Sequence, residues 1–501
     1  MKTAILKSTC IALLMGNMFS CDVLDVEPLD SYTEDGIFTD ANLTESYVTM
    51  NYTKPRNGWS RSSLRFVCDE SMENFNWASA WSINTGGLAP DQLGGLDIWS
   101  DYYANIKNCN IFFSNMDKVE TIDEPRRSWL IGEATFFRAY YYMELVNNYG
   151  GVPLITRLFE LDDPEMMIKR NTYEDCVDFI VSEFQKASEL LPEKFAGENF
   201  GRVTKGAALA MKSRMLLYAA SPWWGVRTYE EAADAAEEVI ELCGGLGVNN
   251  LDPDYQGLFL NPESPEIIFQ RLYNQEYGHY FDAENSPNGW HGYSATCVTQ
   301  EMVDSYEKRG GVMPDTQWYD DKTTTTANPW EDRDPRFYAS IVCDGQSFRD
   351  GEAEFYVNED GTTGGKDSEY GTDNWNYSET HYTIRKFMDE ALINLWSEKA
   401  YHPWIYCRLA EIYLNYAEAK YFCGDEVTAR QYVNFVRERA RNMAEDPTNM
   451  LPDVTESGDA LLKKIQQERK VELAFEEHRY FDVRRWKIAE DTQVGQFHGI
   501  K

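Results

Sequence analysis

Two groups of amphipathic helices, separated by a long stretch without helical periodicity, most constrain how this chain can fold. Apolar residues recur at helical spacing in several segments, which are residues 126–149, 173–191, 203–220, 229–242 and 405–441. Gly150-Gly151 and Pro153 end the first of these segments, because glycine and proline interrupt helices. The pattern predicts antiparallel helix pairs near both ends of a mainly α protein.

The helix pair at 405–441 carries the residue pattern of a tetratricopeptide unit. Tyr413 and Ala417 stand at the positions of its large and small packing residues, Gly424-Asp425 forms the turn, and Ala429 is the packing alanine. Any helical hairpin needs small residues where its axes approach, so one unit alone does not identify the repeat. Several helix pairs in one chain favour a scaffold of tetratricopeptide-like repeats.

The middle of the chain, residues 243–400, is rich in Gly, Asp, Asn, Thr and aromatic residues and has no sustained helical stripe. A compact domain does not hold a structureless loop of this length, so we expect short strands and ordered loops. Such loops on a rigid scaffold are where binding residues usually lie. The predicted organisation is a helical scaffold at about 40–242 and 400–490, with a loop-rich ligand-binding insert between them.

The N-terminus has the pattern of a lipoprotein signal peptide. Lys2 and Lys7 flank the start of an apolar stretch, and the segment ends at Ser20-Cys21. It is too short to remain as a membrane-spanning anchor. We therefore expect removal of residues 1–20, acylation of Cys21 and a mature domain over 21–501. The alternative is a secreted protein in which Cys21 is incidental.

Charge and cysteine usage exclude several classes of protein. A formal net charge of −36 argues against nucleic acid as a partner. The ten cysteines include no CxxC pair, which argues against a disulfide framework or a zinc site. Cys407 and Cys423 fall on one predicted helix, about 24 Å apart at the helical rise, so they should not pair within it.

Cofactor and metal motifs are also missing from the sequence. The six histidines show no HExxH spacing, and Gly365-Lys366 is followed by Asp367 where a phosphate-binding loop needs Ser or Thr. Asp315, Asp320 and Asp321 form a cluster of loop carboxylates of the kind that can bind calcium, but their spacing is not that of an EF-hand. We predict no cofactor and assign no metal site.

Long segments of the chain resemble one protein family. These segments are Phe136–Tyr142 with Asn147–Leu154, Leu216–Pro222, Arg408–Ala419, Glu468–Glu476 and His478–Trp486. In this order and with the signal peptide, the chain resembles the SusD/RagB family of outer-membrane nutrient-binding lipoproteins. The resemblance covers nearly the whole chain. The chain ends at Lys501, sooner after Trp486 than the family pattern implies, so the resemblance does not extend to contacts from a longer tail.

The resemblance implies a fold, a ligand and a partner. The fold would contain four tetratricopeptide-like helix pairs supporting an irregular ligand-binding region. The ligand would be a glycan that is bound without catalysis. The partner would be a SusC-like TonB-dependent transporter, over which the protein sits like a lid. The acidic run Asp22, Asp25 and Glu27 resembles signals that send lipoproteins to the cell surface, so the expected location is the outer surface of the outer membrane.

We predict a structural role for the segment 468–486. Arginines and carboxylates alternate along it, and at three- and four-residue spacing they can pair on the surface of a helix. Leu473, Phe475 and Trp486 would pack inward. We predict no catalytic role for this segment.

Exposed aromatic residues are the expected glycan-binding groups, because a sugar presents flat C–H faces that stack on aromatic rings. Two clusters lie outside the helical stripes. The first contains Trp59, Trp77 and Trp81 with the polar neighbours Asp69, Glu70, Asn74 and Asn76. The second contains Tyr280, Trp290, His291, Tyr293, Trp318 and Trp330.

From these clusters we select candidates for each role. The stacking candidates are Trp77, Trp81, Trp290 and Trp318, with Tyr280 and Tyr293 as further aromatic contacts. The hydrogen-bonding candidates are Asp69, Asn76 and Asn288. Trp99 is assigned to the core because its helical neighbours are apolar, and a large ring is more often core than platform. Stacking and hydrogen bonds of roughly 1 kcal/mol each predict micromolar to millimolar affinity.

Two other functional classes stay open. A glycoside hydrolase needs only two suitably spaced carboxylates. The chain has 83 acidic residues, so their number does not distinguish a hydrolase from a binding protein. Release of reducing sugar would distinguish hydrolysis from binding. A structural scaffold without a ligand would give no heat in calorimetry against a glycan panel.

Overall fold

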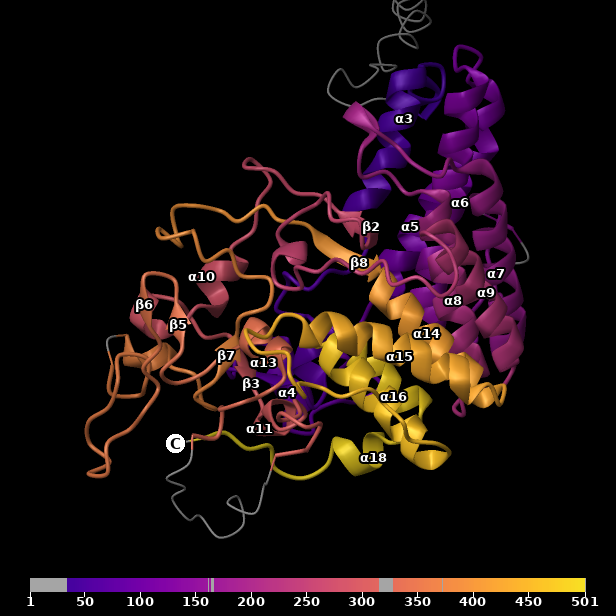
Figure 1. Ribbon diagram of the computed structural model, residues 1–501. Helices are drawn as coiled ribbons and strands as arrows, with labels where there is room; N and C mark the ends of the chain where they lie inside the picture. The colour runs from indigo at the N-terminus through magenta and orange to yellow at the C-terminus, as the bar shows by residue number, and fades with distance from the viewer. Residues whose placement is uncertain (1–33, 161, 164–165, 315–327, 372, 501) are drawn as a thin grey trace, which may run out of the picture.

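The computed structural model describes residues 34–160, 162–163, 166–314, 328–371 and 373–500, and its long helices gather on one side (Figure 1). These helices are α5 (Trp99–Asn115), α6 (Glu124–Tyr149), α7 (Tyr173–Leu190), α8 (Lys205–Ala220), α9 (Tyr229–Leu242), α14 (Leu409–Phe422), α15 (Glu426–Arg441) and α16 (Asp459–Glu472). Shorter helices are α2 (Glu34–Ile37), α3 (Ala41–Thr49), α4 (Ser79–Asn84), α10 (Phe281–Asn285), α11 (Gln300–Val303), α13 (Pro335–Ser340), α17 (Arg479–Arg485) and α18 (Ala489–Thr492). The helices expected at 126–149, 173–191, 203–220 and 229–242 are therefore present, and the segment 405–441 contains α14 and α15.

Local side-chain chemistry fixes the ends of the long helices. The Asp123 carboxylate accepts a hydrogen bond from the Arg126 amide at 3.1 Å and caps α6. Gly150, with a φ of 73°, ends the same helix in a conformation that glycine adopts readily. Thr172 and Asp175 form a capping box at the start of α7.

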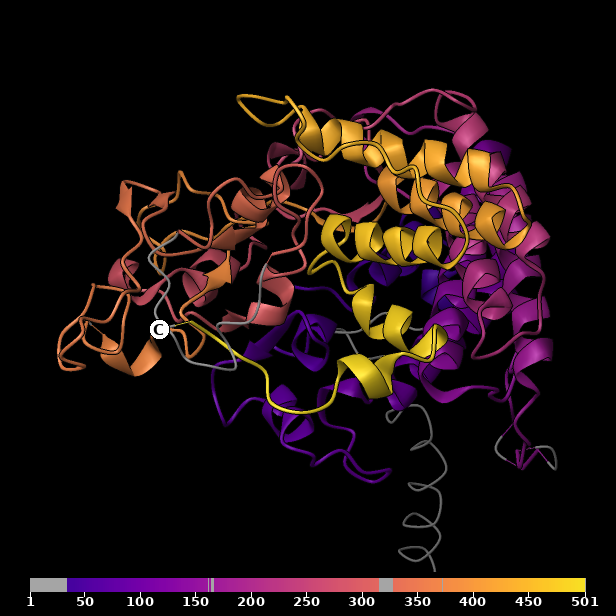
Figure 2. The ribbon, with the colours of Figure 1, turned by 60° about the horizontal axis from the view of Figure 1, so that its bottom comes forward.

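The long helices pack each against the next in the order α5, α6, α7, α8, α9, α14 and α15, and α16 packs against both α14 and α15. α9 and α14 are neighbours in space but far apart in the sequence, so the segment between them is an insertion between two packed helices. Figure 2 also shows the orange and yellow C-terminal helices beside the magenta ones. The predicted mainly α, tetratricopeptide-like fold is confirmed.

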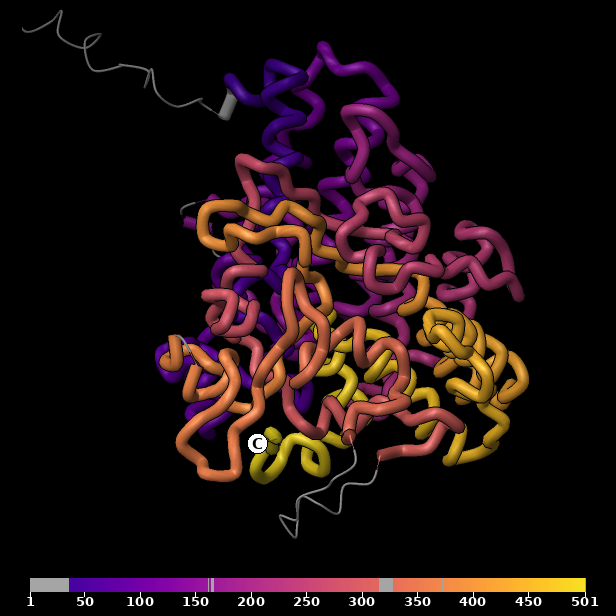
Figure 3. Tube along the Cα trace, turned by 60° about the vertical axis from the view of Figure 1, so that its left-hand side comes forward, coloured from indigo at the N-terminus to yellow at the C-terminus, as the bar shows by residue number. Residues whose placement is uncertain are grey.

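Short strands organise the loop-rich side of the molecule, which Figure 3 turns toward the viewer. A four-stranded sheet has the order β1-β3-β7-β4, from β1 (Ser71–Glu73), β3 (Thr296–Val298), β7 (Thr383–Ile384) and β4 (Ile341–Val342). The other strands pair as β2 (Ile267–Arg271) with β8 (Trp404–Arg408) and β5 (Ser347–Phe348) with β6 (Gly351–Glu352). Because Ser71 pairs with Val298, the sheet binds a segment near the N-terminus to the insert.

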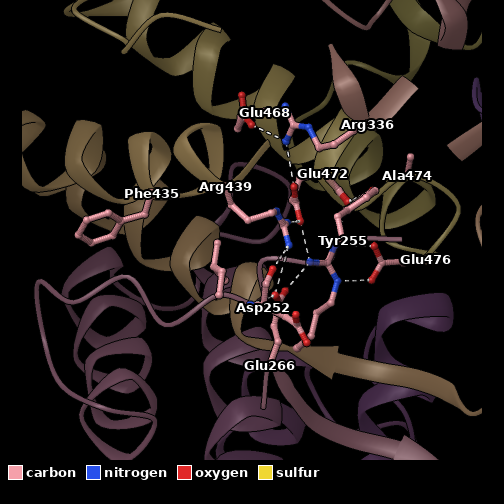
Figure 4. A network of polar contacts seen from close by, with 12 residues as sticks. Asp252, Tyr255, Glu266, Arg336, Phe435, Arg439, Glu468, Glu472, Ala474 and Glu476 are labelled. Atoms are coloured by element: carbon pink, nitrogen blue, oxygen red, sulfur yellow. Dashed lines mark hydrogen bonds and ion pairs between the residues drawn. The ribbon is translucent and has the colours of Figure 1, made fainter. Parts of the chain in front are cut away.

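A buried network of ion pairs joins the helical scaffold to the loop-rich region (Figure 4). Arg408 lies at the end of β8, and its Nη1 is 2.7 Å from Glu266 and 2.6 Å from Glu472. Its Nη2 is 2.6 Å from Glu476. Glu472 also pairs with Arg439 of α15 and with Arg336 of α13. One carboxylate thus connects three separate parts of the fold.

The prediction of surface ion pairs along 468–486 is wrong. The segment is not one helix, because α16 ends at Glu472 and the chain turns with positive φ at Phe475 and Glu477. Most of its charges are buried and pair with distant elements, and the one i,i+3 contact, between Asp482 and Arg485, is itself buried. The inward packing of Leu473, Phe475 and Trp486 is confirmed.

The placement of Cys407 on a helix is also wrong, because it belongs to β8, while Cys423 caps the end of α14. Both are free, and Cys407 is buried. None of the helices in the described ranges combines the length and apolarity needed to cross a bilayer.

Candidate functional site: an aromatic surface on the loop-rich side

A continuous strip of aromatic side chains lies on the loop-rich region. We call it the aromatic ribbon, and it consists of Phe75, Trp77, Tyr280, Tyr293, Trp375 and Trp396. Trp77 is 67% exposed and Trp375 is 64% exposed. Large rings are rarely left so open to solvent, and exposed apolar patches commonly mark interaction sites.

Ring contacts connect the ribbon from end to end. At one end, Trp77 stacks on Phe75 with ring centres 5.4 Å apart and planes inclined by 20°. Tyr293 lies at the centre, 6.1 Å from Phe75 and 5.3 Å from Trp375. It also lies 4.4 Å from Trp396, whose ring stacks on Tyr280 at 6.2 Å. These separations are typical of favourable aromatic pairs.

Several loops that are distant in sequence supply these rings. Phe75 and Trp77 lie between β1 and α4, while Tyr293 precedes β3. Trp375 is in the short helix η8 (Asn374–Asn376), and Trp396 lies between β7 and β8. Tyr280 directly precedes α10.

Hydrogen bonds hold these loops in place. The Trp396 indole nitrogen donates to the His291 carbonyl at 2.9 Å. Asn74 donates from Nδ2 to the Tyr377 carbonyl at 2.8 Å, and Asn376 donates to the Gly292 carbonyl. The ribbon is therefore arranged before any ligand arrives, which lowers the entropic cost of binding.

A charged cluster supports the Trp77 end of the ribbon. The Arg61 guanidinium lies 4.8 Å from the centre of the Trp77 ring, within cation–π range. It forms ion pairs with Glu73 at 3.2 Å and with Glu284 at 3.6 Å. Burial raises the pKa of Glu73 to about 7, although Arg61 and Arg65 act in the opposite direction. Burial also raises the pKa of Glu284.

The arrangement suits stacking on a ligand with flat apolar faces and a polar edge. Asn76 is exposed beside Trp77, and His291 and Asp373 form an exposed pair at 2.6 Å on the same loops. Glu73 and Glu284 are carboxylates that share one arginine, but the Glu73 side chain has no exposed surface. The Glu73 carboxylate is therefore held by Arg61 below the surface and is not presented to the ribbon.

The structure brings together three of the predicted aromatic residues, Trp77, Tyr280 and Tyr293, and leaves Asn76 exposed beside them. Their contact with a ligand stays a prediction. Trp81 is half-buried one turn further along the chain, in α4.

Trp290 and Asn288 are occupied by other contacts. The Lys366 ammonium lies 3.9 Å above the Trp290 ring, and the indole nitrogen donates to Asp350 at 2.8 Å. One face of this ring is therefore covered. Asn288 is fully buried, and its Nδ2 donates to the Lys366 carbonyl at 3.3 Å.

Asp69 is buried in ion pairs. Its carboxylate contacts Arg479 at 2.7 Å and Lys470 at 3.1 Å. Burial opposes ionisation, yet these two cations hold the pKa of Asp69 well below its usual range. The side chain supports the fold and is not presented to the ribbon.

Some predicted residues lie outside the described part of the chain, namely Cys21, Trp318, Asp315, Asp320 and Asp321. Among the described residues, no group of three or more His, Cys, Asp or Glu side chains could hold a metal ion.

Trp375 and Trp396 were not selected from the sequence. Trp375 stands between two asparagines in the polar segment Gly371 to Asn376, where no helical stripe needs a large ring. A large ring that no helical stripe requires is the sequence feature that could have indicated an exposed tryptophan here. Trp396 lies beside Leu395 and offers no such cue, because only the fold places it against Tyr293.

Comparisons with known proteins agree with this architecture. A sequence profile described as "Starch-binding associating with outer membrane" matches residues 22–217, and the SusD family profile matches residues 265–501. A SusD-like protein from Bacteroides fragilis has 31% sequence identity and a TM-score of 0.80, covering 95% of this chain and 91% of that one. The chain therefore belongs to the SusD family.

More distant relatives match over most of their own length. SusD-like protein P2 from Formosa agariphila is 26% identical, over 97% of this chain and 91% of its own. A laminarin-binding SusD-like protein is 21% identical with a TM-score of 0.66, covering 91% of this chain and 93% of that one. At this identity the second comparison shows the fold alone.

Proposed function

We propose that this protein is a cell-surface glycan-binding lipoprotein that captures an oligo- or polysaccharide on the aromatic ribbon and passes it to a partner transporter. The observation that carries the proposal is the ribbon itself, an open and continuous set of rings fixed by hydrogen bonds. Sugar C–H faces stack on such rings. The family description that matches residues 22–217, which refers to starch binding, supports the same ligand class.

Affinity gels test glycan capture. The gels contain soluble starch, laminarin, xylan or polygalacturonate, and they compare the wild type with a Trp77→Ala/Trp375→Ala double variant. Two lost stacking contacts should weaken retention at least about 10-fold. Trp223→Ala is the matched control, because Trp223 is 52% exposed but lies beside α8 on the helical side. Equal retention of the double variant and the control would refute capture on the ribbon.

The membrane anchor and the partner form the second part of the proposal. Acylation of Cys21 would hold the protein on the outer membrane, and a SusC-like TonB-dependent transporter would receive the glycan. The family description, which refers to association with the outer membrane, supports this location. Mass spectrometry of the mature N-terminus should find a lipidated cysteine, and gentle detergent extraction should co-purify a TonB-dependent transporter. An unmodified N-terminus would refute the anchor.

Binding without cleavage is the third part. The fully buried Glu73 side chain and its ion pair with Arg61 argue against a hydrolytic carboxylate pair at the ribbon. Incubation with the retained polysaccharide should release no reducing ends. Release that disappears in a Glu284→Gln variant would favour a glycoside hydrolase instead.

A further inference from the structure

A groove takes part of its lining from the loop that precedes Tyr280 of the ribbon. It has a volume of about 420 Å³, which is within the range of small-ligand sites. Three segments line it: the end of α3 with Tyr52 and Thr53, residues 198–202, and residues 271–277 after β2. Figure 1 shows β2 between α3 and α10. We call this surface the side groove.

The side groove presents aromatic and apolar side chains to solvent. Tyr277 is 68% exposed, and Phe200 and Leu272 are 38% and 39% exposed. The Asn274 side chain accepts a hydrogen bond from the Tyr277 amide at 2.9 Å, which fixes the turn that displays the ring. Exposed apolar side chains that gather in a groove commonly mark a binding site.

An arginine supplies the polar part of the groove. The Arg271 guanidinium lies 4.8 Å from the centre of the Tyr273 ring, and its Nη1 donates to the Thr53 carbonyl at 3.1 Å. Of the residues that the structure describes, none places a carboxylate oxygen within ion-pair distance of Arg271. A guanidinium fixed in this way offers further N–H donors to hydroxyl groups.

The side groove and the ribbon are joined through one short loop. Tyr277 of the groove and Tyr280 of the ribbon are three residues apart, so their Cα atoms are separated by at most about 11 Å. The loop folds back on itself, because Tyr273 contacts His279 at 5.2 Å between ring centres. His279 in turn pairs through its backbone with Ala400. The groove and the ribbon therefore take residues from the same short loop.

We infer that the side groove is a second carbohydrate subsite, which binds a further part of the same glycan chain that the ribbon holds. This inference rests on the proposed function. The groove repeats the chemistry of the ribbon, with aromatic faces and fixed hydrogen-bond donors, and it continues the ribbon along residues 271–280. Two subsites on one chain raise affinity for long ligands, because the second contact forms within the complex already bound.

Ligand length gives the test. Isothermal titration would use short and long oligosaccharides prepared from whichever of the four polysaccharides retains the wild type most strongly. Wild-type affinity should rise by about 10-fold or more from the short to the long ligands. Tyr277→Ala and Arg271→Leu should each reduce that gain severalfold and leave affinity for the short ligands unchanged. Tyr356→Ala is the control, because Tyr356 is 45% exposed on a different loop.

The outcomes separate this inference from the proposed function. A length-dependent gain that survives in both groove variants would overturn the second subsite while glycan capture still holds. Absence of retention on all four polysaccharides would overturn glycan capture, and the subsite with it. Loss of affinity for short and long ligands alike would show that Tyr277 belongs to the ribbon site, and would also overturn a separate subsite.

Discussion

The aromatic ribbon and the buried ion network both connect segments that are distant in the sequence, but they do so at opposite levels of exposure. In the ribbon, Trp77 and Trp375 leave about two thirds of their surface open to water. In the network, Arg408 and Glu472 are almost wholly buried. The ribbon leaves apolar rings exposed to water, where they contribute little to the stability of the fold. The network buries charged groups, which carries a large desolvation cost.

The contrast indicates which residues serve the fold and which are available to a ligand. A buried charge must keep every partner, so the network holds the loop-rich region in one position relative to the helices. The ribbon is then presented on loops that have a fixed base. Substitutions in the ribbon should therefore change ligand affinity more than stability, and substitutions in the network should change stability first.

The largest expected effect is from Glu472→Ala. This change leaves Arg408, Arg439 and Arg336 without a shared carboxylate, and removal of one partner from a buried ion pair costs about 3–5 kcal/mol. Chemical denaturation would measure the loss in free energy of unfolding. Asp453→Ala is the control, since Asp453 pairs with Arg441 at the surface and should contribute less than about 1 kcal/mol. Similar losses for both variants would remove the distinction between network and surface pairs.

The next largest expected effect is the difference in stability loss between a buried and an exposed tryptophan variant. Trp59 is 9% exposed and packs against His279, Phe281 and Trp404, so Trp59→Ala should cost about 3–5 kcal/mol of unfolding free energy. Trp375→Ala should change the unfolding free energy by less than about 1 kcal/mol, because the ring is mostly exposed. Thermal melts and affinity gels on the same samples would show opposite rankings. A stability loss at Trp375 as large as that at Trp59 would mean that the ribbon is part of the core.

The sequence predicts the helical scaffold well, because periodicity, caps and glycine stops act locally. The segment at 126–149 differs from α6 by only two residues at its start. The ion network could not be predicted, since spacing suggests pairs within a helix, whereas Arg408 and Glu472 meet only when β8 packs beside α16. The burial of these charges depends on the tertiary fold.

The candidate site could be predicted only as a region. Composition identifies loops rich in aromatic residues, and Trp77, Tyr280 and Tyr293 follow from it. Sequence alone does not reveal that Lys366 covers Trp290, because the two residues lie on separate loops. Trp396 joins the ribbon through a contact that spans about a hundred residues, which no local pattern records.

Acid should weaken the core beside the ribbon. Burial lowers the pKa of His279 to about 4, with a smaller contribution from Arg271, and it lowers the pKa of the neighbouring His402 as well. The folded state therefore binds fewer protons than the unfolded chain, and stability is lost as pH falls from about 6.5 toward 4. In His279→Gln this loss should be smaller, as measured by denaturation at pH 4.5, 6.5 and 8. An unchanged pH slope would show that other groups control acid unfolding.

The smallest expected effect tests how charge supports the ribbon. Arg61→Leu removes the cation beside Trp77, and an exposed cation–π contact contributes about 0.5–1 kcal/mol. Glycan affinity should therefore fall about 2- to 5-fold in calorimetry, whereas Arg441→Leu, at a distant surface pair, should have no effect. Measurement at pH 6 limits the loss of stability, because Glu73 has a pKa of about 7 and can take a proton when its partner is removed. A much larger loss of affinity would mean that Arg61 contacts the glycan directly, and unchanged affinity would restrict its role to neutralising Glu73 and Glu284.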